Sequence, residues 1–143
     1  QTFADDIVAS KAFQLGDEIR VRFAGTVHVV SSPNPTKEIL AHGAPIERRA
    51  LQSLIDDEDL ESFADCYARA IDGLSRERLT LHHQPAGTVE DGVFTPLHFS
   101  RGSRRLRGSM TAEHSDDNFS HMNAEFGRHV LADVFARILP ATS

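Results

Sequence analysis

Two short alternating segments, followed by prolines, constrain the fold of this chain more than any other feature of its sequence. In residues 18–24 and 26–31, apolar and polar side chains alternate as they do in half-buried strands. Little more than Gly25 separates the two segments, so the sequence predicts a β-hairpin. Pro33 and Pro35 cannot donate a hydrogen bond to a sheet, and they end the second strand.

Short helices are predicted directly after the hairpin. Residues 35–40 begin with a proline, which suits the first turn of a helix, and Gly43 can close this helix in a left-handed conformation. Pro45 opens a second helix, over residues 46–54, in the same way.

An acidic run at residues 56–59 begins a third predicted helix. The carboxylate of Asp56 or Asp57 can accept hydrogen bonds from the free N–H groups of the first turn, and Gly73 occupies a C-cap position. An apolar stripe at helical spacing follows the acids: Leu60, Phe63, Ala64, Tyr67 and Ile71. Helix capping therefore accounts for the acidic run better than a pair of catalytic carboxylates does.

Alternation returns in the second half of the chain and predicts three more strands. Leu79, Leu81 and His83 share one face of the first strand, and residues 93–100 form the second. Residues 101–103 turn the chain into the last strand. The inner face of that strand carries Leu106, Gly108, Met110 and Ala112. Consecutive strands with tight turns predict an antiparallel meander.

Helices are also predicted at both ends of the chain. Residues 2–15 have apolar side chains at helical spacing, and Gly16 ends that helix. Asp116 and Asp117 open the final helix. Its apolar stripe consists of Phe119, Met122, Phe126, Val130, Leu131, Val134, Phe135 and Ile138. A stripe this wide needs cover from the domain, from a second copy, or from both.

The order of these elements resembles a PAS domain with a flanking helix on each side. The likeness covers residues 19–113, and three short segments carry it. Ser-Pro-Asn-Pro at 32–35 is similar to the family's N-P step, Glu-Ile-Leu-Ala-His-Gly at 38–43 to its E-L-L-G-Y segment, and Leu-Ile-Asp-Asp-Glu-Asp at 54–59 to its I-H-P-E-D step. The chain departs from the family where Ala41 replaces a frequent Gly and where acids replace His-Pro.

The resemblance implies an α+β fold, with a PAS-like five-stranded antiparallel sheet covered by short helices. It also implies three consecutive segments. These are an N-terminal flanking helix at 1–17, a PAS-like sensor domain at 18–114, and a C-terminal flanking or linker helix at 115–143.

In function, the resemblance implies a sensory or regulatory module of signal transduction. Such a module binds a small ligand in its core, forms a homodimer, or does both, and relays a packing change through its terminal helices to an effector. The implied ligand pocket is lined by Leu54, Phe63, Tyr67, Leu81, His83, Leu97, Phe99 and Met110. The implied dimer interface contains Phe3, Ile7, Phe126, Val130, Val134 and Ile138. Two alternatives stay open, a ligand-free dimerisation module and a small NTF2-like α+β enzyme.

We find no catalytic constellation and no cofactor signature. Cys66 lacks the N-C-R-F-L-Q neighbours of flavin-binding members, and we expect it to be a core or half-buried thiol. None of the eight histidines lies between residues 46 and 72, where haem-binding members commonly supply an axial ligand. Glu125 could share a helix face with His121 or His129, but no third ligand lies nearby. We therefore expect no haem, flavin or metal, and we leave the cofactor unassigned.

The charge and composition restrict the partners and the compartment. A net charge of −6 argues against nucleic-acid binding, and the basic cluster at 101–107 is interpreted as a solvated hairpin. The sequence has no apolar run of membrane-spanning length and no signal-peptide pattern, and its single cysteine allows no intrachain disulfide. These features predict a cytoplasmic protein. The N-terminal Gln suggests a fragment of a longer chain.

Overall fold

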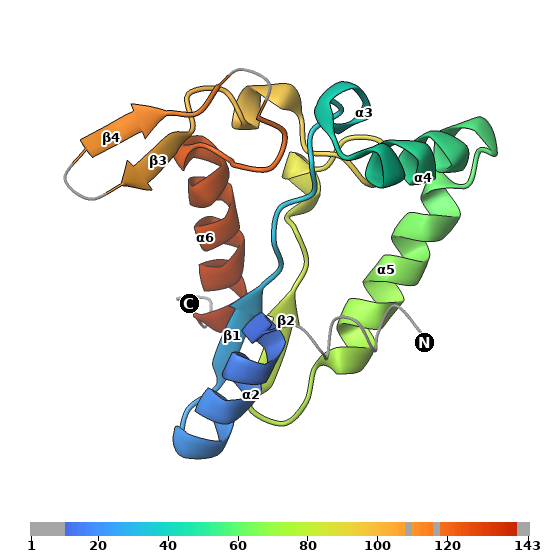
Figure 1. Ribbon diagram of the computed structural model, residues 1–143. Coiled ribbons are helices and arrows are strands. Elements are labelled where there is room, and N and C mark those ends of the chain that lie inside the picture. Colours follow the sequence, from blue (N-terminus) through green and yellow to red (C-terminus); the bar gives the residue numbers. More distant parts are fainter. Residues whose placement is uncertain (1–10, 108–109, 116–117, 140–143) are drawn as a thin grey trace. The chain divides into compact units, whose positions relative to one another are not determined.

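The computed structural model describes residues 11–107, 110–115 and 118–139 (Figure 1). The chain divides into two compact units, and it passes from one to the other more than once. Unit 1 is made of the chain up to Ser32 and of Ser62–His83, and unit 2 is made of Pro33–Glu61 and the chain from Gln84 onward.

Unit 1 is built around a pair of parallel strands. Its described elements are α2 (Lys11–Arg22), β1 (Val27–Val30), most of α5 (Leu60–Leu74) and β2 (Leu79–His82). β1 and β2 are neighbours, with Val27 opposite Leu79 and Val30 opposite His82 (Figure 1). Two predicted strands are therefore confirmed, the one at 26–31 and the one that carries Leu79 and Leu81. They pair with each other in parallel, however, and neither is part of the hairpin or the meander that was predicted.

The core of unit 1 is apolar and draws on both helices and both strands. Its buried members are Phe13, Ile71, Leu74, Leu79 and Leu81, with Val27, Val29 and Tyr67 packed against them. Each fully buried side chain of this kind contributes about 1.5–3 kcal/mol. Gly16 allows α2 to approach the strands closely, because a Cβ atom there would lie 3.0 Å from Cγ2 of Val29.

The predicted first strand, residues 18–24, is wrong, because α2 continues through Gly16 to Arg22. Arg20 forms an ion pair of 2.9 Å with Asp17, one helical turn earlier, which favours the helix. The three apolar side chains of the alternating pattern, Ile19, Val21 and Phe23, are exposed. These side chains do not cover the face of a sheet, so the alternation of apolar and polar residues here does not indicate a strand. The predicted hairpin is therefore not formed. Most of the predicted helix at 2–15 lies outside the described residues.

Unit 2 contains the remaining described elements. They are α3 (Ile39–His42), α4 (Pro45–Asp56), two 3₁₀ turns η1 (Ala86–Thr88) and η2 (Leu97–Phe99), strands β3 (Arg104–Arg107) and β4 (Met110–Glu113), and α6 (Ala124–Ile138). Pro45 begins α4, as predicted, but the helix predicted at 35–40 is wrong at its start, because α3 begins only at Ile39. The predicted turn at 101–103 is confirmed as well, with Gly102 at a φ of 67°.

Buried polar side chains hold the loops of unit 2 together. The side chain of Gln84 accepts a hydrogen bond of 2.7 Å from the Asn34 N–H and donates to Thr95 Oγ1 at 3.0 Å. The Thr95 hydroxyl donates in turn to the Asn34 carbonyl at 2.7 Å. These bonds replace a sheet ladder here, so the predicted strand at 93–100 is wrong. Residues 90 and 94 form a single bridge, and a 3₁₀ turn follows.

Asn123 fixes the start of α6. Its side-chain oxygen accepts from the N–H groups of Glu125 and Phe126, at 3.0 and 3.1 Å. Its side-chain nitrogen donates to the carbonyls of His98 and Arg101, at 2.8 and 2.9 Å. The helix therefore begins at Ala124, seven or eight residues later than predicted. The predicted opening residues, 116 and 117, lie outside the described part of the chain.

The predicted caps of the central helices are also corrected. Gly43 has a φ of −66°, so it does not end α3 in the left-handed region. The acids expected to cap the next helix bond back to α4 instead: Asp56 accepts from Gln52 at 2.8 Å, and Asp57 accepts from Ser53 at 3.1 Å. Accordingly α5 begins later, at Leu60, and it continues through Gly73 to Leu74.

The PAS fold expected from the order of elements is wrong. The strands of the described residues form two separate two-stranded sheets, β1–β2 and β3–β4, and not one five-stranded antiparallel sheet. The single strand predicted over residues 106–112 is also wrong, because its described residues belong to two strands, β3 and β4, which pair antiparallel with Arg104 opposite Glu113. With no continuous sheet, the ligand pocket that the family places between a sheet and its helices has no inner sheet face to line it.

Candidate functional site

The side chains expected to line a ligand pocket fall into different surroundings. Tyr67 and Leu81 belong to the core of unit 1, whereas Phe99 is buried in unit 2, 5.8 Å from the ring of Phe126. Two of the others are half-buried: Leu54 on α4, and His83 just after β2. Two are exposed: Phe63 on α5, and Leu97 on η2. Met110 lies on β4, and its side chain is outside the described part of the structure. Neither unit alone therefore brings this set together.

Two histidines face each other across β1 and β2. Nδ1 of His28 lies 2.9 Å from Nε2 of the buried His82. His83, the next residue, forms a separate pair of 2.7 Å with the Asp72 carboxylate, as expected when successive strand side chains point to opposite faces. No group of three His, Cys, Asp or Glu side chains suited to a metal ion occurs among the described residues. The imidazole pair therefore falls short of the three protein ligands of a catalytic zinc site.

A second set of histidines lies in unit 2. The rings of His114 and His121 stack with their centroids 4.1 Å apart, and His129 meets the edge of Phe99 at 5.5 Å. His121 precedes the start of α6, so it does not share a helix face with Glu125 as predicted. The contacts that the structure shows for these rings are stacking and edge packing.

The guanidinium groups of Arg48 and Arg49 lie along a groove on α3 and α4. It has a volume of about 380 Å³ and is lined by Leu40, Pro45, Arg48, Arg49 and Gln52. None of the residues that line this groove was predicted to form a site. A usable signal was present, because two consecutive arginines follow the helix-opening proline of an acidic chain.

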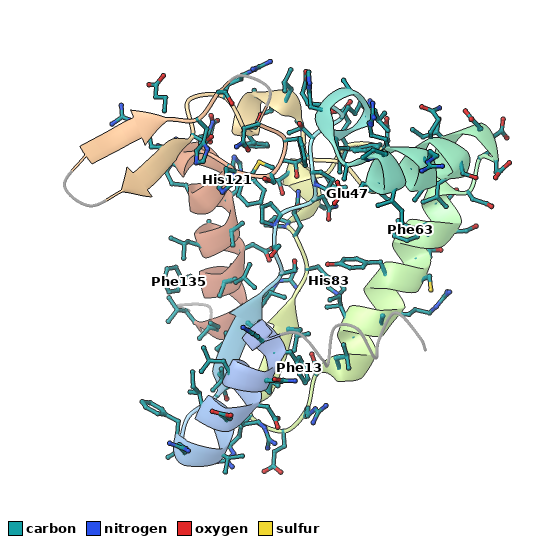
Figure 2. All side chains as sticks on the ribbon, viewed as in Figure 1. Phe13, Glu47, Phe63, His83, His121 and Phe135 are labelled. Atoms are coloured by element: carbon teal, nitrogen blue, oxygen red, sulfur yellow. The ribbon has the colours of Figure 1, made fainter. Side chains whose placement is uncertain are left out.

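Among the described helices of unit 2, α6 carries more exposed large apolar side chains than any other. Three of its large side chains, Leu131, Phe135 and Ile138, are 40–55% exposed, and Leu139, which follows the helix, is 62% exposed. Figure 2 shows Phe135 projecting outward from α6. The other side of the same helix is covered, with Phe126 and Val134 each 8% exposed.

The dimer residues expected from the sequence therefore divide between the two sides of α6. Phe126 and Val134 are buried, Val130 is half-buried, and Ile138 is exposed. Phe3 and Ile7 lie outside the described residues. Leu131 and Phe135, which belong to the predicted stripe but not to the expected dimer interface, form the centre of the exposed side.

Other expectations concern Cys66 and the membrane. Cys66 is exposed on α5 and is not the core or half-buried thiol predicted. Within the described ranges, no helix is both long enough and apolar enough to cross a bilayer.

Comparison with known proteins adds no assignment: no protein family, no curated protein and no solved structure matches this chain.

Proposed function

We propose that this chain is an interaction module that pairs with a second copy of itself through α6. The observation that carries the proposal is the row of exposed apolar side chains, Leu131, Phe135 and Ile138, on successive turns of one helix. When large apolar side chains gather on one exposed face of a helix, that face is more often a protein contact surface than a surface that stays in contact with water.

The spacing on this face suits a symmetric antiparallel pair of helices. At about 100° per residue, Ala124, Gly127, Leu131, Phe135 and Ile138 fall within an arc of about 80°. An antiparallel pair centred on Leu131 places Gly127 of each copy opposite Phe135 of the other. It likewise places Ala124 opposite Ile138. Small side chains then face large ones on both sides of the two-fold axis, and this is a self-complementary surface of the kind that a C2 dimer requires.

Gly127 provides the space that this packing needs. A Cβ atom built on Gly127 would meet no other atom within 4 Å. A partner's aromatic ring can therefore lie against the helix backbone at this point, as small residues allow in close helix pairs.

The same geometry sets the strength of the pairing. Each side chain gains less than the roughly 1.5–3 kcal/mol of full burial, because it is already partly covered in one copy. Association itself costs at least about 4 kcal/mol. The pair therefore has a dissociation constant in the micromolar to millimolar range. Such weak pairing suits a regulatory contact between effector segments attached to each copy, which is the role we propose for the module.

Sedimentation equilibrium tests this proposal on the whole chain, from about 10 μM to about 1 mM. We expect the apparent mass to rise toward that of a dimer. Leu131→Gln should abolish the rise, whereas Val21→Gln, at an exposed apolar position of α2, should leave it unchanged. A mass that stays monomeric throughout, or a rise that Leu131→Gln leaves intact, would contradict the proposal.

A further inference from the structure

We propose that the groove on α3 and α4 binds a small aliphatic carboxylate. The groove presents two guanidinium groups and one amide beside two apolar walls, Leu40 and Pro45. It is an open surface depression with a volume of about 380 Å³. An apolar wall next to paired cationic donors is the combination that recognises an acid with a short hydrocarbon body. This inference does not depend on the pairing of α6.

Neither arginine of the groove forms an ion pair within the described chain. Arg20, Arg76, Arg101 and Arg137 each have a carboxylate within 4 Å, but Arg48 and Arg49 have no ion pair among the described residues. Both bond to backbone carbonyls of their own segment instead. Nη1 of Arg48 lies 3.5 Å from the Ala41 oxygen, and Nε of Arg49 donates to the Pro45 oxygen at 3.2 Å.

The Nε–H group of Arg48 lacks a hydrogen-bond partner among the described atoms although it is covered. A covered charged donor without a partner is unfavourable. A carboxylate can satisfy it, because its two oxygens match the Nε and Nη2 donors of one guanidinium edge. The Arg48 side chain is half-buried as a whole, and binding at this edge requires a change of its χ angles toward the groove.

Neighbouring acids select a singly charged ligand. The Glu47 carboxylate accepts from the Ala44 N–H at 3.0 Å, and the Asp56 carboxylate accepts from Gln52 at 2.8 Å. Both carboxylates belong to α4, as the two arginines do. The local charge is therefore close to zero before a ligand arrives, which favours a carboxylate monoanion over a phosphate dianion.

Arginine side-chain NMR tests this site in the whole protein. The ¹⁵Nε–¹Hε signals are followed during titration with sodium butyrate, with sodium phosphate and with sodium chloride, at constant ionic strength. We expect butyrate to shift the Arg48 signal saturably, with a dissociation constant of about 1–10 mM. Chloride should give no saturable shift, and phosphate should bind more weakly than butyrate.

Three variants make the test specific. Arg48→Gln and Arg49→Gln should each weaken butyrate binding about tenfold or more, which is the loss of one charge-assisted contact. Arg69→Gln, at an exposed position of α5, should leave it unchanged. Backbone amide spectra establish that each variant is folded. Butyrate shifts that do not saturate, that survive in both groove variants, or that are weaker than those of phosphate would overturn the assignment.

Discussion

Gly127 and Phe135 lie about two turns apart on the exposed side of α6, one with open space around it and the other with a ring 53% exposed. Within a single copy neither feature has a use, because the glycine weakens the helix and the ring contacts water. In an antiparallel pair each explains the other, since the ring of one copy fills the space above the glycine of its partner.

The size of the side chain at residue 127 should therefore control the pairing. Gly127→Ala should raise the stability of α6 by about 1 kcal/mol and should leave pairing intact, because alanine is the better helix former and remains small. Gly127→Leu fills the space that we assign to Phe135, so it should weaken pairing about tenfold. Thermal unfolding and sedimentation equilibrium measure the two effects. If Gly127→Leu pairs as the wild type does, the proposed register is incorrect.

Gly16 and Gly73 should respond in opposite ways to alanine. At Gly16 a Cβ atom would lie 3.0 Å from Val29 Cγ2 and 3.5 Å from Leu79 Cδ1, whereas at Gly73 it would meet no atom within 4 Å. Gly16→Ala should lose about 1–3 kcal/mol through crowding of the core. Gly73→Ala should gain up to about 1 kcal/mol through helix propensity. Urea unfolding measures both, and a gain of stability in both variants would show that α2 does not pack closely on β1.

Both the oxygen and the nitrogen of the Asn123 side chain should contribute to the stability of the start of α6. Asn123→Ala removes two accepted and two donated hydrogen bonds, and should lower the free energy of unfolding by about 2 kcal/mol or more. Asn123→Asp keeps the capping oxygen but loses the donors to His98 and Arg101, so it should cost less than alanine but more than zero. Equal stability of the aspartate variant and the wild type would mean that the donated bonds contribute nothing.

The Lys37 ammonium group should lose its proton at higher pH in the folded protein than in the unfolded chain. Its hydrogen bond to Asp91, and next its hydrogen bond to Glu90, raise the pKa of Lys37 above its ordinary value of 10.5, while desolvation acts in the opposite direction. Because the folded pKa is the higher one, the stabilisation is fully present below pH 10.5 and is lost as pH rises through the folded pKa.

Carbon-13 NMR of the Lys37 Cε atom measures this shift against the same residue in urea. Asp91→Asn should bring the folded pKa of Lys37 down toward its value in urea. Asparagine suits this position because Asp91 has a φ of 48°, a region that asparagine tolerates. An unchanged pKa in this variant would assign the shift to Glu90 alone.

Local sequence signals identified those elements whose cause is local. Pro45 at the first turn predicted the start of α4, and the β-branched residues 26–31 predicted β1. The prediction of which strands pair with each other was wrong. β1 joins β2 in parallel across a long stretch of chain, and alternation specifies a strand's faces but not its neighbour. The alternation at 18–24 was misleading, because α2 continues through these residues to Arg22 and their apolar side chains bury no sheet face.

The candidate sites were predictable only in part, for a related reason. The width of the apolar stripe on α6 indicated more surface than one domain covers. Which side is covered depends on Phe126 packing against Phe99, a contact that the sequence alone does not reveal. The groove likewise depends on α3 turning back onto α4, which brings Leu40 beside the two arginines.

Disulfide trapping across the pair tests self-association through α6 most directly. In a Cys66→Ser background, which removes the exposed native thiol, Ala124→Cys and Ile138→Cys are prepared as separate proteins, mixed and oxidised. The linked products are then weighed by mass spectrometry. The antiparallel pair predicts that the mixed disulfide between residues 124 and 138 predominates, because these positions face each other across the two-fold axis. If oxidation yields only monomers, or only disulfides between identical residues, the proposed antiparallel pairing through α6 is contradicted.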